Sequence, residues 1–360
     1  MYFGAGTQRH EQAGPEHRGE ATRSDAHTDL FISHLSALRY WRRDEGLGTS
    51  ELVEGLSLDN ATKSVRDCNR LLSAKMDTDA FPMHMSEGNP LYVLVGCKGA
   101  RRYASTLVPR VWQGPVPANA FRRIGPHIYV SSPEFVFVQM ASTLSIVELA
   151  QLGNELCGGY YLQRVSGFGE HTDKQPLTSR ADLKRFALCV ATARGAKKAL
   201  RALRWVCDRC NSPMETNVLL MLCMPSRMGG WQLPLPAVNK PIEVGKRLAR
   251  YVGGRLYAPD FMWEVHKAGK RAYVTAEYDS SEHHDDADDA QHTRIRRNDM
   301  KVMGYLVTSI NASQVADANR FQLPARQIAR DLGIYRRPLS PQRLLKQNQL
   351  IWQLRQEDFR

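Results

Sequence analysis

Three acidic residues lie close together in the second half of this 360-residue chain, in a stretch that has the pattern of two β-strands. Asp260 follows a proline in the first apolar run, and Glu277 and Asp279 end the second run, which covers Ala272 to Asp279. β-Branched and aromatic residues fill the second run, and glycine or serine bounds it, as is typical of a strand. Alternate residues of a strand share one face, so we expect Glu277 and Asp279 to point the same way.

The segment Lys267 to Lys270 contains a glycine and predicts a turn between the two strands. An antiparallel hairpin across this turn would bring Asp260 near Glu277 and Asp279. Like charges that are held together need a counter-charge, and a divalent cation with oxygen ligands is the usual one in proteins. The spacing therefore predicts a site for Mg²⁺ or Mn²⁺, against the alternative that these are exposed carboxylates on a solvated strand.

A further acidic residue, Glu215, stands three positions after Ser212 at the expected start of a helix, with Pro213 in its first turn. This spacing is that of a capping box, in which the serine and the glutamate satisfy free backbone N–H groups. Glu215 can therefore serve the helix alone, or it can also take part in a site.

The residues Ser212 to Glu215, Pro259-Asp260, Glu277-Tyr278-Asp279 and Arg296-Arg297-Asn298 together resemble a restriction-endonuclease-like domain of the PD-(D/E)XK superfamily. More narrowly, they are similar to very-short-patch-repair-type endonuclease domains of actinobacterial proteins. The resemblance covers residues 212–333. Upstream, the segments 31–34, 90–95 and 131–135 are similar to the N-terminal part of abortive-infection antitoxin regulators.

The resemblance implies a metal site and a set of catalytic residues. In the family, an acidic residue on a leading helix joins acidic residues on the sheet to bind magnesium, which implies Glu215, Asp260 and Glu277 as metal ligands. The catalytic residues that it implies are Asp260 and Glu277, with Asp279 assisting. Asp279 stands where the wider superfamily keeps a lysine and the narrower family commonly has an acidic residue, so the group that stabilises the attacking water is not assigned. A histidine commonly follows this motif, and His284 (or His283) matches it as a general base or as a group that polarises a phosphate oxygen, against the alternative of a solvated loop.

Basic residues near these acidic ones predict contacts to a nucleic acid backbone. The segment from His292 to Met303 has a helical pattern that carries Arg294 and Arg297, and the earlier segment around Gly195 carries Lys197 and Arg201. A basic helix face is a phosphate-contact surface or simply a solvated face, and the sequence favours neither. The segment 98–103 has the same two interpretations: a phosphate contact or a solvated turn.

The elements that must position these residues divide the chain into five parts. We expect a disordered tail at 1–28, an α+β domain at 29–175, a basic helical connector at 176–211, an endonuclease-like domain at 212–333 and a basic tail at 334–360 that holds a short amphipathic helix. In the second part, 31–41 has helical spacing, 91–95 is a buried strand, and His127 to Val130 is a strand before a helix capped by Ser131 or Ser132. His34 is a packed or capping residue in this interpretation.

Composition limits the class of protein and of partner. The net charge is +12, from 49 Lys and Arg against 37 Asp and Glu, which attracts nucleic acids or other anionic surfaces. The 7 cysteines are spread and odd in number, and Cys207 and Cys210 lack the second ligand pair of a zinc site, so we expect reduced thiols in a cytoplasmic protein. No apolar run approaches the length of a membrane span, and no signal peptide is evident.

The sequence therefore predicts an α/β protein whose C-terminal domain is an α/β/α restriction-endonuclease-like fold beside a smaller α+β domain. The expected activity is metal-dependent endonucleolytic hydrolysis of DNA, in repair or phage defence. Two alternatives remain: a catalytically silent DNA-binding regulator of the antitoxin type, and a protein-interaction module with an acidic loop. Weakening of DNA binding by salt separates the last from the others.

Overall fold

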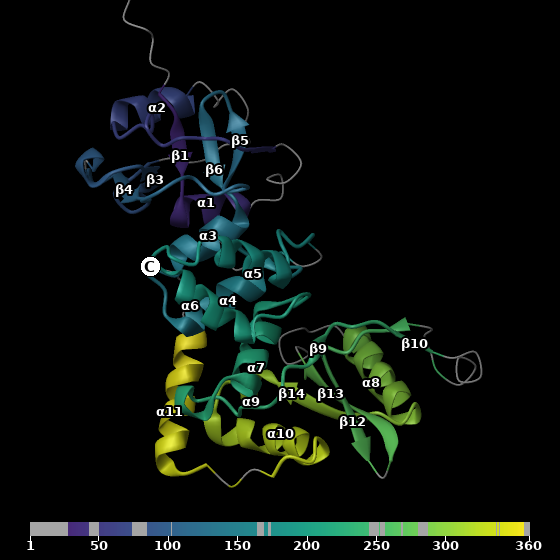
Figure 1. The fold of residues 1–360 in the computed structure, drawn as a ribbon. Helices are drawn as coiled ribbons and strands as arrows, with labels where there is room; N and C mark the ends of the chain where they lie inside the picture. Colours follow the sequence, from purple (N-terminus) through teal and green to yellow (C-terminus); the bar gives the residue numbers. More distant parts are fainter. Residues whose placement is uncertain are drawn as a thin grey trace, which may run out of the picture.

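The structure is a computed structural model of the whole chain, shown in Figure 1. The residues that it describes are 28–42, 50–73, 85–101, 103–163, 169–171, 174–244, 252, 256–267, 269–279, 287–335, 337 and 339–355. Mixed sheets and helices make the chain an α/β protein, as the sequence predicts. The expected tail 1–28 lies almost entirely outside the described residues.

The N-terminal part is built on a six-stranded mixed sheet in the order β2-β5-β6-β1-β3-β4. Its strands are β1 (Leu30–Ile32), β2 (Glu51–Val53), β3 (Leu91–Val95), β4 (Leu107–Val111), β5 (Phe121–Gly125) and β6 (Ile128–Ser131). The short β1 is central, parallel to β6 and antiparallel to β3. The expected helix over 31–41 is thus wrong in its first residues: Leu30 to Ile32 pair as a strand, and α1 (His34–Trp41) follows.

The helices of this part pack with the sheet in one hydrophobic core. They are α2 (Val65–Ser73), α3 (Pro133–Met140), α4 (Ile146–Leu156), α5 (Arg180–Cys189) and α6 (Ala196–Ala202), with 3₁₀ turns η1 (Lys98–Ala100) and η2 (Leu203–Trp205) and a small hairpin of β7 (Tyr161–Gln163) and β8 (Gly169–His171). Ser132 caps α3, and Gly195, at a φ of 96°, separates α5 from α6. One hydrophobic cluster runs from Leu30 to Val206, so the helices expected as a connector pack into the first core.

The C-terminal part is built on a four-stranded sheet in the order β14-β13-β12-β9. Its strands are β9 (Ala237–Val238), β12 (Phe261–Lys267), β13 (Lys270–Asp279) and β14 (Leu306–Asn311), and a separate pair joins β10 (Ile242–Glu243) to β11 (Leu256–Tyr257). β12 and β13 form the expected antiparallel hairpin, with Phe261 opposite Ala276. β14 is parallel to β13, and the helix between them crosses over the sheet (Figure 1).

Two layers of helices cover this sheet. The helices of this part of the chain are α7 (Pro213–Cys223), α8 (Ala287–Val302), α9 (Ala312–Val315), α10 (Ala318–Asp331) and α11 (Pro341–Leu354), with the 3₁₀ turn η3 (Ser226–Met228); of these, α7, α8, α9 and α10 contact the sheet. Val274 and Ala276 of β13 pack with α7 and α10 in a second hydrophobic cluster. The alternate residues Glu277 and Asp279 contact α8 instead. The strand alternation predicted from the sequence is confirmed.

The two hydrophobic cores are connected by a helix that contributes side chains to both. Helix α4 gives Leu149 and Leu152 to the first cluster and Val147 and Ala150 to the second. Helix α11, in the segment expected as a basic tail, packs against α4, α7 and α10, as Figure 1 shows, and its Leu350 is 1% exposed. Its apolar stripe therefore belongs to the second core.

Candidate active site

Glu215 lies at the start of α7 and is 8% exposed. Its backbone N–H donates to Ser212 Oγ at 3.1 Å, which is the helix cap that the sequence predicts. Its carboxylate does not close the capping box: Glu215 Oε2 accepts from the backbone N–H of Asn211 at 2.9 Å and from Asn239 Nδ2 at 2.6 Å. Burial, and then the charge of Asp260, raise the pKa of Glu215 to about 7.

Asp260 lies between the other acidic groups. The residue stands in the bend just before β12, not on a strand as expected, because β12 begins to pair only at Phe261. Asp260 Oδ2 accepts from the backbone N–H of Tyr278 at 2.7 Å, which fixes the carboxylate at the end of β13. Burial raises the pKa of Asp260 to about 6, although this hydrogen bond and two nearby arginines act in the opposite direction.

Glu277 is fully buried on the face of β13 that meets α8. Its Oε2 accepts from Arg296 Nη2, whereas its Oε1 is buried and has no hydrogen-bond partner among the described residues. Burial, and then the charge of Asp260, raise the pKa of Glu277 to about 7, against the lowering effect of Arg296. A buried carboxylate oxygen without a partner is costly, so Glu277 is a group that gains from a further ligand.

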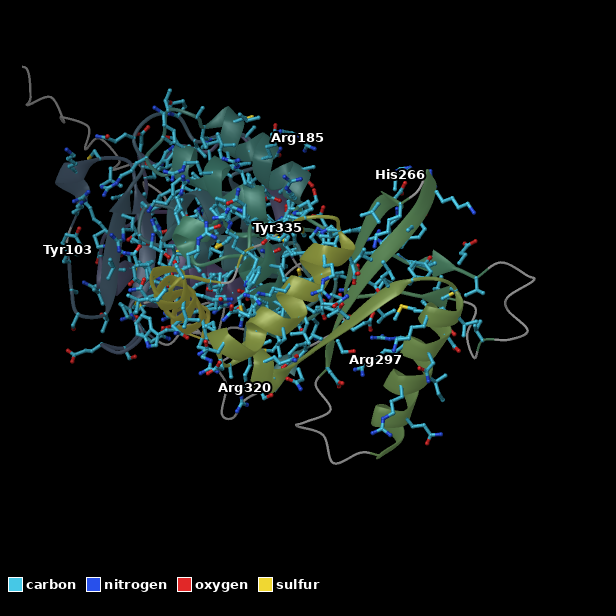
Figure 2. The ribbon with its side chains drawn as sticks, turned by 90° about the horizontal axis from the view of Figure 1, so that it is seen from below. Tyr103, Arg185, His266, Arg297, Arg320 and Tyr335 are labelled. Carbon is cyan, nitrogen blue, oxygen red and sulfur yellow. The ribbon has the colours of Figure 1, made fainter. Side chains whose placement is uncertain are left out.

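Asp279 lies at the outer end of the same strand face and is paired with Arg297, whose Nη2 donates to Asp279 Oδ2. Arg297 and Arg296 are consecutive on α8, and the buried Nε atom of each has no hydrogen-bond partner within the described ranges. Figure 2 shows Arg297 between α8 and the sheet. Two guanidinium groups therefore offset part of the negative charge of the site.

Three elements thus bring together three buried carboxyl groups in electrostatic contact: the start of α7, the bend before β12 and the end of β13. In this carboxylate cluster of Glu215, Asp260 and Glu277, Asp260 raises the pKa of both glutamates, so the charge on one group depends on the charge on the others. Such a cluster takes up protons or a cation near neutral pH. In the part of the chain that the structure describes, no group of three or more His, Cys, Asp or Glu side chains is already arranged to hold a metal ion.

The other predicted site residues are not brought to this cluster. Lys197 and Arg201 lie on α6, which packs on α3, α4 and α5; in Figure 1 α6 stands well apart from the four-stranded sheet. Their basic face therefore lies on the first core and not beside the carboxylate cluster, because Ala196, Ala199 and Ala202 hold the buried face of α6 in that core; contact of this face with a nucleic acid stays a prediction. Arg294 lies on α8 and is exposed.

His284 and its alternative His283 lie outside the described residues. Two contacts of the site were not predicted: those of Asn239 with Glu215 and of Arg296, a residue of the resemblance motif, with Glu277. Asn239 follows β9, and its backbone N–H donates to the Asp260 carbonyl at 3.1 Å while its side chain reaches Glu215. No spacing in the sequence indicates this contact. Arg296 neighbours a predicted residue, and the face of α8 that meets the sheet includes both.

Comparison of the chain with family models, with curated proteins and with solved structures gives no match. Within the described ranges, no helix is both long and apolar enough to cross a bilayer. The carboxylate cluster is therefore the feature of the molecule that best indicates a function.

Proposed function

We propose that this chain is a metal-dependent endonuclease that hydrolyses phosphodiester bonds of DNA, and that residues 212–333 hold a restriction-endonuclease-like α/β/α domain. One observation carries the proposal: Glu215, Asp260 and Glu277 are buried carboxyl groups at the start of a leading helix, in the bend before β12 and at the end of β13, and the charge of Asp260 acts on both glutamates. This is the arrangement that the sequence resemblance implies for the metal ligands of that fold.

The donor set suits a hard divalent cation such as Mg²⁺ or Mn²⁺. All three groups offer carboxylate oxygens, and Glu277 Oε1 is buried with no partner of its own. Glu215, Asp260 and Glu277 would hold the ion, which when bound polarises a phosphate and lowers the pKa of a water molecule. Displacement of protons from groups with pKa values of about 6 to 7 needs little free energy at neutral pH.

The arginines of α8 have two roles in this proposal. Arg296 orients Glu277, and Arg297 holds Asp279, which stands where a lysine is expected in the wider superfamily. The positive charge is thus supplied from α8 instead of from the strand. Arg294 is exposed on the same helix and, with Arg297, suits contact with the DNA backbone.

The alternative function is a catalytically silent DNA-binding regulator. It is favoured by the ion pairs of Glu277 with Arg296 and of Asp279 with Arg297, because they already neutralise two carboxylates without a metal ion. A regulator of this kind binds DNA in a salt-sensitive way and does not cut it.

Cleavage assays separate these functions. Supercoiled and mismatched DNA are incubated with Mg²⁺, Mn²⁺ or EDTA and with the intact protein, Asp260→Asn or Glu277→Gln. Glu264→Gln is the matched control, because Glu264 is an exposed carboxylate on β12 that pairs only with Arg271 at the surface. We expect metal-dependent cutting that is lost in the two site variants and kept in the control. Cutting that survives both site variants refutes the proposed site, and tight DNA binding with no cutting favours the regulator.

A further inference from the structure

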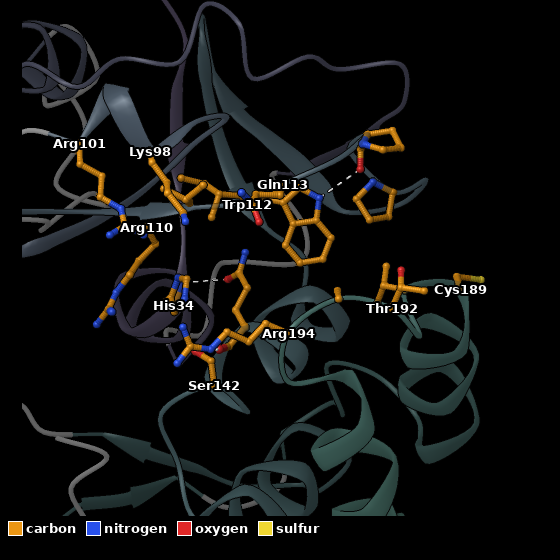
Figure 3. Close-up of a pocket in the computed structure, with 17 residues that line it drawn as sticks. His34, Lys98, Arg101, Arg110, Trp112, Gln113, Ser142, Cys189, Thr192 and Arg194 are labelled. Atoms are coloured by element: carbon orange, nitrogen blue, oxygen red, sulfur yellow. Dashed lines mark hydrogen bonds between the residues drawn. The ribbon is translucent and has the colours of Figure 1, made fainter.

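A second candidate site lies in the N-terminal part, in a cavity of about 540 Å³ between the sheet edge and the α5–α6 loop (Figure 3). This volume is in the range of small-molecule sites. Strands β3 and β4 and the turn η1 line one side, and the loop after α5 lines the other. The cavity does not include any residue of the carboxylate cluster, so a ligand bound here is independent of the proposed nuclease activity.

Four cationic side chains line the cavity: Lys98, Arg101, Arg110 and Arg194. No aspartate or glutamate is among the lining residues, and within the described part of the chain none of the four forms an ion pair. Most surface arginines and lysines are close to charges of both signs, whereas here four positive charges share one concavity. A concentration of one sign in a cavity focuses its potential on an incoming anion.

Of the four cations, Arg110 is held in place by stacking on an aromatic ring and by partial burial. Its guanidinium lies over the ring of Tyr92, 5.5 Å from the centroid, and its buried Nε atom has no hydrogen-bond partner in the part of the chain that the structure describes. The stacking fixes the position of the charged group in advance, and the free N–H leaves a donor to satisfy. An arginine prepared in this way suits a phosphate, whose oxygens accept from the guanidinium fork.

His34 adds a polar but uncharged group to the same wall. It is the first residue of α1, its backbone N–H donates to Gln139 Oε1 at 2.9 Å, and its Nδ1 lies 3.0 Å from Ser33 Oγ. Burial and the nearby Arg110 lower its pKa to about 3, so the ring is neutral at physiological pH. The first turn of α1 contains no acidic residue, and its positive end therefore favours an anion as well.

The cavity is also lined by an aromatic ring, that of Trp112. Trp112 stands edge-on to Phe135, with ring centroids 4.7 Å apart and an interplanar angle of 88°, and its Nε1 donates to the Pro115 carbonyl at 3.1 Å. These contacts fix the indole, and Pro115 and Pro117 are also among the residues that line the cavity. A fixed aromatic ring beside a cationic wall suits a ligand that has a flat ring at one end and phosphate at the other.

We propose that this cavity binds a nucleoside phosphate, with the phosphates held by Lys98, Arg101, Arg110 and Arg194 and the base held against Trp112. The same chemistry is presented by a free nucleotide and by the phosphorylated 5′ end of a nucleic acid strand. Lys98 and Arg101 of the segment 98–103 line this cavity. The sequence alone allows either a phosphate contact or a solvated turn for that segment.

Titration calorimetry on the full chain tests the proposal, with ATP, tripolyphosphate, and a short oligonucleotide with and without a 5′ phosphate as probes. Lys98→Glu with Arg101→Glu reverses two exposed charges of one wall, and Arg194→Ala removes one from the opposite wall. The matched control is Lys63→Glu with Arg66→Glu, two exposed cations outside the cavity in the same part of the protein. Thermal melts confirm that each variant folds.

We expect each cavity variant to weaken ATP binding about tenfold or more, since charge-assisted hydrogen bonds are lost, and the control to leave it unchanged. Tripolyphosphate should bind about fivefold or more weakly than ATP, because it lacks the base. Binding of only the 5′-phosphorylated oligonucleotide, lost in the cavity variants, supports the site and identifies the strand end as its ligand. Equal binding of tripolyphosphate and ATP overturns the role of Trp112. Absence of binding for every phosphate probe, or binding that the cavity variants leave intact, overturns the site itself.

Discussion

Replacing Asp260 with asparagine should make the protein more stable without metal and, at the same time, unable to respond to metal. The amide keeps an oxygen that accepts from the Tyr278 N–H. It removes the negative charge that raises the pKa of both Glu215 and Glu277. The pKa of Asp260 rises from 3.8 to about 6 in the folded protein. The folded state therefore binds more protons than the unfolded state between these two pH values, and stability falls as the pH rises through this window.

The magnitude comes from the size of the shift. The difference between 3.8 and about 6 is about two pKa units, and each unit corresponds to about 1.4 kcal/mol, so the ionised Asp260 costs up to about 3 kcal/mol above pH 6. Asp260→Asn should recover part of this cost at pH 8 in EDTA, which raises Tm by several degrees, about 2–4 °C for each kcal/mol. The intact protein should instead gain stability from Mg²⁺, by about 2.7 kcal/mol at a concentration 100-fold above Kd.

Differential scanning calorimetry between pH 5 and pH 8, with EDTA or Mg²⁺, measures both effects. We expect the variant to have a higher Tm than the intact protein in EDTA at pH 8, and we expect this difference in Tm to disappear in Mg²⁺. Glu264→Gln should behave like the intact protein in every condition. Two results would refute the reasoning: a lower Tm of Asp260→Asn in EDTA at pH 8, or a Mg²⁺ shift that the variant retains.

Three further predictions concern other parts of the molecule. Leu350→Ala should cost about 2–5 kcal/mol in urea unfolding, because this side chain is 1% exposed in the second core; a cost below about 1 kcal/mol would mean that α11 is dispensable. The pKa of His34 is lowered to about 3, below its unfolded value near 6.5, so stability should be lost as the pH falls through this range by up to about 1.4 kcal/mol per unit, and His34→Gln should reduce that slope. Arg297→Gln should weaken DNA binding and reduce the slope of log K against log salt by about 1; an unchanged slope would place this residue outside the interface.

Much of the local structure was predictable because it depends on local chemistry. The hairpin of β12 and β13 is indicated by two strand-like runs and a glycine turn, and that register alone carries Asp260 to the end of β13. Ser132 and Ser212 cap the helices expected to begin beside them, since a hydroxyl before proline and an acidic residue suits only that position. These parts of the candidate site need no knowledge of the remaining chain.

The remainder could not be predicted because it depends on distant pairing. Leu30 to Ile32 continue the helical spacing of α1, yet two strands about 60 and 100 residues away make them the centre of a sheet. The sequence of α6 predicts a basic face but does not show whether DNA or solvent contacts it. Only the packing of the α6 alanines into the first core shows that this face lies far from the carboxylate cluster. The contact of Asn239 with Glu215 likewise joins the loop after β9 to the start of α7, two segments that share no sequence pattern.

Arg296 either serves the metal site or replaces the metal ion, and one variant distinguishes these roles. Arg296 lowers the pKa of Glu277, so Arg296→Gln should raise that pKa further above its value of about 7. If Arg296 serves the site, the variant should bind Mg²⁺ more weakly at pH 7 and recover at pH 8.5, because the ion must displace a more tightly held proton. Calorimetric titration at both pH values measures this, with Arg294→Gln as the control on the exposed side of α8. Tighter Mg²⁺ binding by Arg296→Gln at pH 7 would show instead that the guanidinium occupies the place of the cation, and the silent regulator would then be the better description of this protein.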